Sequence, residues 1–152
     1  MSKHHIKPRE QRRIMDYAMK VLGTLGENKW RVLLMVEPSD DDAYGSVNIA
    51  PEKYVVELYL AENWHELSNE TRRNTITHEM LHVVHKRVDH VVYDLDPLLR
   101  HDEQTDLRTK YQREIELMVD HFATFMSDTH SLTEEWDEAW ARAAKSGKEV
   151  SA

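Results

Sequence analysis

Residues 75–84 have the sequence Thr-Ile-Thr-His-Glu-Met-Leu-His-Val-Val, which predicts a helix with a metal-binding face. This stretch contains the pattern His-Glu-x-x-His, with His78 and His82 four residues apart. Residues four apart project from the same side of an α-helix, so both imidazoles can reach one tetrahedral metal ion. The apolar residues of the stretch fall on the opposite half of the helix. We therefore expect a helix that is buried behind and carries two histidines in front.

Glu79 follows the first histidine and lies about 100° around the helix from it. Its carboxylate is then close to the open coordination position of a metal ion held by His78 and His82, where it can take a proton from a bound water. The spacing therefore indicates two ligands and a general base. His85 lies on the same side, but it is about 10 Å along the helix from His78, so one ion cannot bind both. We expect His85 to line a cleft or to be solvated.

The third protein ligand has to come from another element. A later predicted helix carries Glu116 and Asp120 on one flank of its apolar stripe, and Glu114 and His121 on the other flank. Helical geometry alone does not choose between these two pairs. The small side chain of Ala123, beside Glu116, leaves room for a close neighbour and mildly favours the first pair.

Hydrophobic periodicity predicts a single α+β domain over residues 1–152. An N-terminal helix comes first, a small three-stranded sheet (mixed or antiparallel) follows, and three helices complete the chain. Ser131 and Glu134 have the spacing of a capping box for the last helix, and Gly147 is placed to end it. The expected elements are helix 8–22, strands 30–36, 44–49 and 54–60, helix 69–93, a mobile connection 94–104, helix 105–126, and a final helix after residue 131.

Aromatic residues one turn apart on this last helix, Trp136 and Trp140, have two explanations. They form either a stripe that binds a partner or an amphipathic face that docks on the core, and we favour the core-facing role.

On the preceding helix a second set of apolar residues recurs at steps of three and four, which predicts one buried stripe. Its members are Leu107, Tyr111, Ile115, Met118, Phe122 and Phe125.

Composition limits the classes of function that need to be considered. The chain has no cysteine, which excludes disulfides and cysteine-ligated metal sites and fits a reducing, cytoplasmic location. Its 20 basic and 28 acidic residues give a net charge of −8, so we expect no nucleic-acid partner. No targeting segment and no apolar run of membrane-spanning length is visible, so we expect no membrane partner.

The pattern His78-Glu-x-x-His82, followed by Glu116-x-x-x-Asp120 on a later helix, resembles the gluzincin pattern of zinc metallopeptidases. The segment 116–123 is also similar to the short ImmA/IrrE metallopeptidase family. That family usually carries Asn where this chain has Asp120, so at this position the match is closer to thermolysin-like gluzincins. The resemblance covers residues 70–126.

This resemblance implies a minimal zincin-like fold with Zn²⁺ as its cofactor. It implies His78, His82 and Glu116 as the metal ligands, with Glu79 as general base. Asp120 is then the partner that orients His78. The implied activity is hydrolysis of peptide bonds in a peptide or protein substrate, by a water that the metal activates.

Two further expectations come from the same resemblance. Strand 54–60, just before the metal helix, is expected to be an exposed edge on which an extended substrate pairs, with the connection 94–104 as a lid. The alternative to a peptidase is a zinc-binding protein without protease activity, in which the metal has a structural or interaction role. A structural site would not need Glu79, which favours the enzyme.

One related clan does not fit, and one expected group has no motif. The metzincin extension needs glycine at position 85 and histidine at position 88, where this chain has His85 and Val88. The histidine or tyrosine that usually steadies the oxyanion cannot be assigned from the sequence. Four residues remain candidates for that role: Tyr93, His101, Tyr111 and His121.

Overall fold

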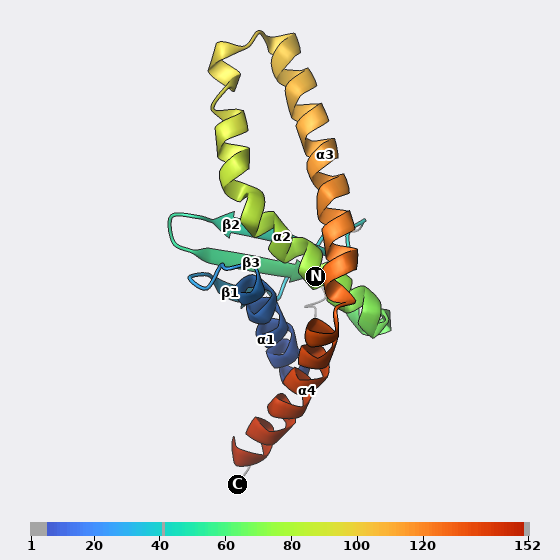
Figure 1. Ribbon diagram of the computed structural model, residues 1–152. Coiled ribbons are helices and arrows are strands. Elements are labelled where there is room, and N and C mark those ends of the chain that lie inside the picture. The colour runs from blue at the N-terminus through green and yellow to red at the C-terminus, as the bar shows by residue number, and fades with distance from the viewer. Residues whose placement is uncertain (1–5, 41, 151–152) are drawn as a thin grey trace.

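A computed structural model describes residues 6–40 and 42–150 (Figure 1). The predicted α+β order is confirmed: one helix, three strands and then three longer helices. Short 3-10 helices at Trp64–Glu66 and Asp96–Leu98 precede the first two of the three longer helices. The main elements are α1 (Pro8–Thr24), β1 (Arg31–Leu34), β2 (Gly45–Ala50), β3 (Val55–Leu60), α2 (Asn69–Tyr93), α3 (His101–Ser127) and α4 (His130–Val150).

The sheet is mixed, with strand order β1-β3-β2. β1 pairs with β3 in parallel, and β2 pairs with β3 antiparallel, with Val47 opposite Leu58. The expectation that strand 54–60 is an exposed edge is therefore wrong, because β3 is the central strand. β1 and β2 are the two edge strands, and β3 lies between them although it comes last in the sequence. Of the two edge strands, β2 is the one that packs against α2.

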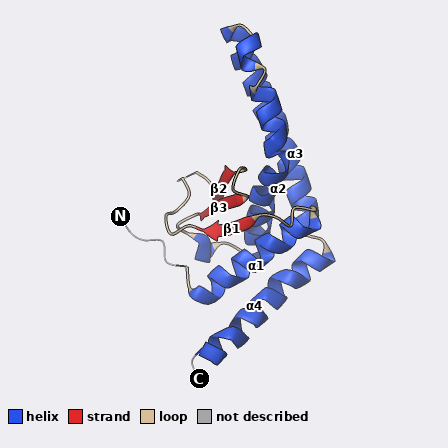
Figure 2. Ribbon diagram, turned by 90° about the vertical axis from the view of Figure 1, so that its left-hand side faces the viewer, coloured by secondary structure: helices blue, strands red, loops and turns tan. Residues whose placement is uncertain are grey.

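The core lies between one face of this sheet and helices α1, α2 and α4. Val56, Leu58 and Leu60 alternate along β3 and are fully buried, as expected for a strand with one face on the core. Figure 2 shows α1 and α4 side by side. At their contact the Tyr17 and Trp136 rings meet edge to face with centroids 5.2 Å apart.

The core-facing role of the two tryptophans of α4 is confirmed. Trp136 is completely buried. Trp140 is half-buried, and the guanidinium of Arg9 lies 3.7 Å from its ring centroid. The capping residues predicted for α4 are wrong, however. The helix already begins at His130, so Ser131 lies inside its first turn, and it runs through Gly147 to Val150. Only Asp128 and Thr129 separate α3 from α4, so α4 begins before the predicted cap at Ser131.

Helices α2 and α3 form a long antiparallel hairpin that extends away from the sheet (Figure 1). The prediction of a mobile connection over residues 94–104 is wrong. The 3-10 helix and the first turn of α3 occupy most of that range, at the tip of the hairpin. The carboxylate of Glu103 accepts a hydrogen bond from the backbone N–H of Arg100 at 2.9 Å, which extends α3 four residues further than predicted. Among the described residues, no helix is long and apolar enough to cross a bilayer.

The single apolar stripe predicted for α3 is divided between two faces. Its N-terminal half is half-buried against α2, whereas Met118, Phe122 and Phe125 are exposed. Val119 and Ala123 take the buried positions instead. A step of four residues turns a helix slightly past a full turn, so the contact line with α2 drifts from one set of residues to the next. The outer half of α2 likewise exposes Val88 and Val91.

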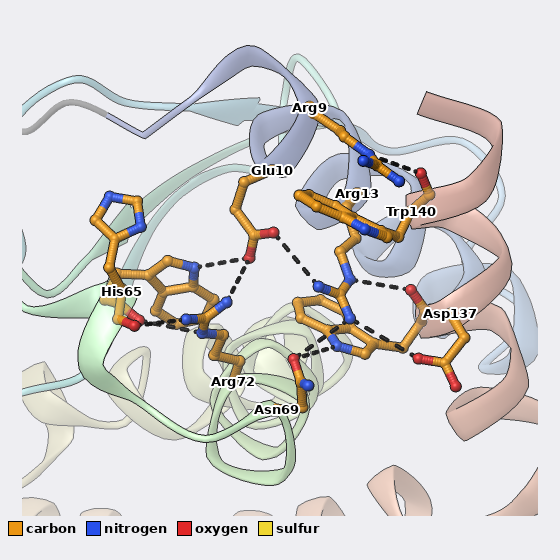
Figure 3. Close-up of polar contacts among 10 residues, drawn as sticks. Arg9, Glu10, Arg13, His65, Asn69, Arg72, Asp137 and Trp140 are labelled. Carbon is orange, nitrogen blue, oxygen red and sulfur yellow. Dashed lines mark hydrogen bonds and ion pairs between the residues drawn. The ribbon is translucent and has the colours of Figure 1, made fainter. Parts of the chain in front are cut away.

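A buried carboxylate joins three helices at the base of the fold (Figure 3). Glu10 on α1 is 5% exposed, and its Oε1 accepts hydrogen bonds from Trp64 Nε1 and from the Arg72 guanidinium on α2, both at 3.2 Å. Its Oε2 accepts from Arg13 at 3.5 Å. Arg13 in turn donates to the backbone carbonyl of Trp136 on α4 at 3.0 Å. The network therefore fixes α1, α2 and α4 relative to one another.

Replacing Glu10 with alanine should lower the free energy of unfolding by about 3 kcal/mol, because the buried guanidinium of Arg13 and the half-buried one of Arg72 lose their shared carboxylate. Chemical denaturation followed by circular dichroism measures this change. Glu52→Ala, in an exposed turn, is the matched control and should stay within about 0.5 kcal/mol of the parent. A similar small effect at Glu10 would contradict the importance of this carboxylate for the fold.

Candidate metal centre

Three side chains from two helices converge at the base of the α2–α3 hairpin. The Nε2 atoms of His78 and His82 lie 3.1 Å apart. One carboxylate oxygen of Glu116 is 3.4 Å from His78 Nε2, and the other is 3.3 Å from His82 Nε2. Among the described residues this is the one group of histidine, aspartate and glutamate side chains whose ligand atoms lie close enough to hold a metal ion.

The separations between these atoms match the ligand shell of zinc. Zinc binds histidine nitrogen and carboxylate oxygen at about 2.0–2.2 Å in tetrahedral geometry, which sets neighbouring ligand atoms roughly 3.3 Å apart. The distances of 3.1, 3.3 and 3.4 Å lie around that value. If each of the three side chains supplies one ligand atom, the fourth tetrahedral position is open.

Asp120 fixes the tautomer of the first histidine. Its Oδ1 lies 2.9 Å from His78 Nδ1, and because an ionised carboxylate only accepts hydrogen bonds, Nδ1 carries the proton. The Nε2 lone pair of His78 is then directed toward Glu116 and His82. A proton or a metal ion between this lone pair and the Glu116 carboxylate would satisfy both groups, and the position fits a metal ion.

The two candidate pairs that the sequence left open have different positions. Glu116 and Asp120 both face α2, whereas Glu114 is exposed and contacts Arg113 at 3.3 Å. His121 is exposed on α3, with its ring against Phe122. The structure therefore brings together Glu116 and Asp120 with the histidines of α2 and leaves the other pair outside the cluster.

Glu79 is buried beside the three converging side chains, with its Oε1 4.0 Å from His78 Nε2. Burial and the negative charge of Glu116 raise the pKa of Glu79 to about 8. A cation bound between the histidines and Glu116 would lower that pKa. A carboxylate in this position can hold a proton and release it, which is the requirement for a general base.

His82 is poised in the neutral form that binds metals. Burial lowers the pKa of its imidazole to about 4, with the neighbouring His78 and His85 acting in the same direction. Because metal binding requires a neutral imidazole, little free energy is lost to deprotonation near neutral pH.

The sequence did not predict a hydrogen-bonded chain that begins at His82. His85, 9% exposed, has its Nε2 2.6 Å from His82 Nδ1. Its Nδ1 lies 3.0 Å from Asp89 Oδ1, which also accepts from the Tyr111 hydroxyl at 2.6 Å. His85 therefore lines the cleft, as one of its two expected roles required. The spacing of positions 82, 85 and 89 on one helix face was the available signal for this chain.

An open cleft of about 420 Å³ separates the metal-ligand face of α2 from strand β2. Glu79, Lys86 and Glu116 line it on the helical side. The sheet side is formed by the edge strand, in particular Gly45 and Val47. No residue of the connection 94–104 lines the cleft, and it lies at the far end of the hairpin (Figure 1). The structure therefore does not place that connection as a lid.

Four residues were candidates for steadying an oxyanion, and none of them lines this cleft. Tyr93 and Tyr111 line a neighbouring cavity of about 250 Å³, which shares His82 with the cleft. Tyr111 already donates to Asp89, and His101 begins α3 at the hairpin tip. His121 is exposed, as described above. Lys86 is the cationic side chain on the cleft wall, and the sequence gave no reason to select it.

Comparisons with known proteins give no relative for this chain: no family model, no curated protein and no solved structure matches it.

Strand β2 can approach α2 only because residue 45 is glycine. A Cβ at Gly45 would lie 2.8 Å from Thr75 Cγ2 and 3.4 Å from Glu79 Cγ. Both neighbours belong to the metal-ligand helix, and Thr75 is buried. The glycine therefore sets the width of the cleft beside the candidate general base.

Gly45→Ala should lower the free energy of unfolding by about 1–3 kcal/mol, because the added methyl group overlaps a buried side chain. Thermal and chemical denaturation measure the loss. Gly147→Ala is the control, since a Cβ there meets nothing within 4 Å in a helix, and it should raise stability by up to about 1 kcal/mol. Equal stability of the Gly45 variant and the parent would contradict the close approach.

Proposed function

We propose that this protein is a zinc-dependent metallopeptidase of minimal size that hydrolyses peptide bonds. One observation carries the proposal: His78, His82 and Glu116 each offer a ligand atom within 4.8 Å of the other two, and Glu79 is buried beside them. A purely structural zinc site would have no use for that buried carboxylate. The resemblance to gluzincins, drawn from the sequence, agrees with this assignment.

His78, His82 and Glu116 would hold the ion, and Asp120 would orient the ring of His78 through their 2.9 Å contact. When bound, zinc would supply a Lewis acid that makes water a nucleophile near neutral pH and polarises a carbonyl group. Glu79 takes the proton of the attacking water and returns it to the leaving nitrogen, which is the work of a general base and then of a general acid. Its burial keeps this carboxylate from being fully solvated.

We assign substrate binding to β2 instead of β3. Within the described residues β2 has a strand neighbour on one side only, and its other edge borders the cleft. An extended peptide can add to such an edge through main-chain hydrogen bonds, which are largely independent of side-chain identity. The open cleft offers few enclosed pockets, so we expect weak selectivity for individual side chains. The proposed substrate is a peptide or protein segment, and the proposed location is the cytoplasm.

The parent protein should bind one equivalent of zinc, and Glu116→Ala should weaken binding by more than the ~100-fold typical of partners outside the ligand shell. Glu114→Ala, two residues away and outside the cluster, should leave the affinity unchanged. Competition with a chromophoric chelator measures both affinities. If Glu114→Ala strips the metal and Glu116→Ala does not, the ligand assignment is wrong.

Glu79→Gln should lower hydrolysis of a quenched-fluorescence peptide mixture by about 10²–10⁴-fold, because it removes the group that moves the proton. Zinc content should be unchanged, since Glu79 is not a ligand. Glu70→Gln, on the exposed first turn of the same helix, is the control and should keep full activity. If the zinc-loaded parent cleaves no peptide at all, the peptidase assignment fails and a zinc-binding protein without protease activity is favoured.

A further inference from the structure

In the hydrogen-bonded chain from His82 to Tyr111, only one assignment of the protons gives every hydrogen bond one donor and one acceptor. Tyr111 O–H donates to Asp89 Oδ1 at 2.6 Å, and His85 Nδ1 lies 3.0 Å from the same oxygen. An ionised carboxylate only accepts, so both neighbours donate to it. Burial and the Asp89 charge raise the pKa of the Tyr111 phenol, which keeps its proton.

The proton on His85 Nδ1 determines the rest of the chain. A neutral imidazole has one donor and one acceptor nitrogen, so His85 Nε2 is the acceptor. His82 Nδ1, 2.6 Å away, must then donate to it. This leaves the lone pair of His82 on Nε2, the atom that lies 3.3 Å from Glu116 and 3.1 Å from His78.

The two ligand histidines therefore receive the same tautomer by different routes. His78 has a carboxylate directly on its Nδ1, supplied by Asp120 one turn beyond Glu116 on α3. Beside His82, α3 supplies Glu116, which is already a proposed ligand. Closer to the hairpin tip α3 carries Tyr111, so it offers no carboxylate for His82 Nδ1. The carboxylate that plays the corresponding part, Asp89, is on α2 and too far along the helix to contact His82. His85 lies between them and contacts both side chains.

We infer that His85 is a positioning residue for the metal centre: held by Asp89 and Tyr111, it accepts the Nδ1 proton of His82 and directs the Nε2 lone pair toward the metal position. It is not a ligand of that ion, because it contacts the opposite nitrogen of the His82 ring. The inferred hydrogen bonds of His85 belong to the metal-free chain, whereas the role of His85 in zinc binding rests on the proposed function. In zinc proteins, loss of such a partner weakens metal affinity by roughly 10–100-fold.

The first test measures the tautomer of His82 in metal-free protein by ¹⁵N–¹H correlation of the imidazole rings. His82 should be protonated at Nδ1 and unprotonated at Nε2. His85→Leu removes the acceptor and should convert His82 to a mixture of tautomers, whereas His85→Gln places an amide oxygen near the Nε2 position and should restore the parent pattern. A parent protein with His82 protonated at Nε2 would overturn the inference.

The second test measures zinc affinity by chelator competition. His85→Leu should bind zinc about 10–100-fold more weakly, and His85→Gln should recover most of the loss. Tyr111→Phe removes only the hydroxyl donor of Asp89 and should give a smaller decrease in the same direction. His90→Leu, an exposed histidine on the same helix, is the matched control and should bind as the parent does.

The outcomes separate this inference from the proposed function. If the parent binds no zinc, the proposed function fails, while the tautomer measurement still decides the role of His85. Parent-like zinc affinity in both His85→Leu and Tyr111→Phe would overturn the positioning role and leave the zinc assignment standing. Two zinc equivalents in the parent and one in His85→Leu would show that His85 is itself a ligand, which also overturns it. Should His85→Leu fail to fold, Tyr111→Phe supplies both readouts with nearly unchanged packing.

Discussion

The position of α2 depends on the buried carboxylate of Glu10. A buried charge without partners is very unfavourable, so the fold surrounds this group with two guanidinium groups and an indole N–H. One guanidinium belongs to Arg72, in the first turn of α2, and the other, Arg13, reaches the backbone of α4. The helix that carries His78 and His82 therefore starts from a rigid base. The candidate metal centre lies about two turns further along, where the helix leaves the core.

Local sequence information was sufficient for the parts of the fold with local causes. The bounds of α2 were predicted to the residue, because Ser68 caps the helix by accepting the Thr71 N–H at 3.1 Å and both the apolar period and the motif continue beyond it. The i, i+4 spacing also brought His78 and His82 together as expected. For Glu116 and Asp120 the small side chain of Ala123 gave only a mild preference, and their roles came from a family resemblance, because the face of α3 that meets α2 depends on the packing of two long helices.

Features that depend on contacts between residues far apart in the chain could not be predicted from the sequence. The order β1-β3-β2 depends on a crossover between strands that have similar apolar patterns, so β3 was mistaken for the edge. The Glu10 network joins residues more than fifty positions apart. The partners of His82 required both the helical spacing of His85 and Asp89 and the level of α3 at which Tyr111 lies. The strand order, the Glu10 network and the place of Tyr111 leave no periodic signal in a single sequence.

The division of the centre between two helices has a thermodynamic consequence. Within the described residues α3 contacts the body of the protein chiefly through α2, so the distance of Glu116 from the two histidines is set by the closure of the hairpin. Binding of the proposed metal ion would therefore be linked to hairpin closure, and each would change the other by the same factor. The exposed side chains Val88, Val91 and Leu95 lie on the outer part of this hairpin. Any molecule that binds them and alters the angle between the helices would change the affinity for the proposed ion, and the ion would change the affinity for that molecule to the same extent.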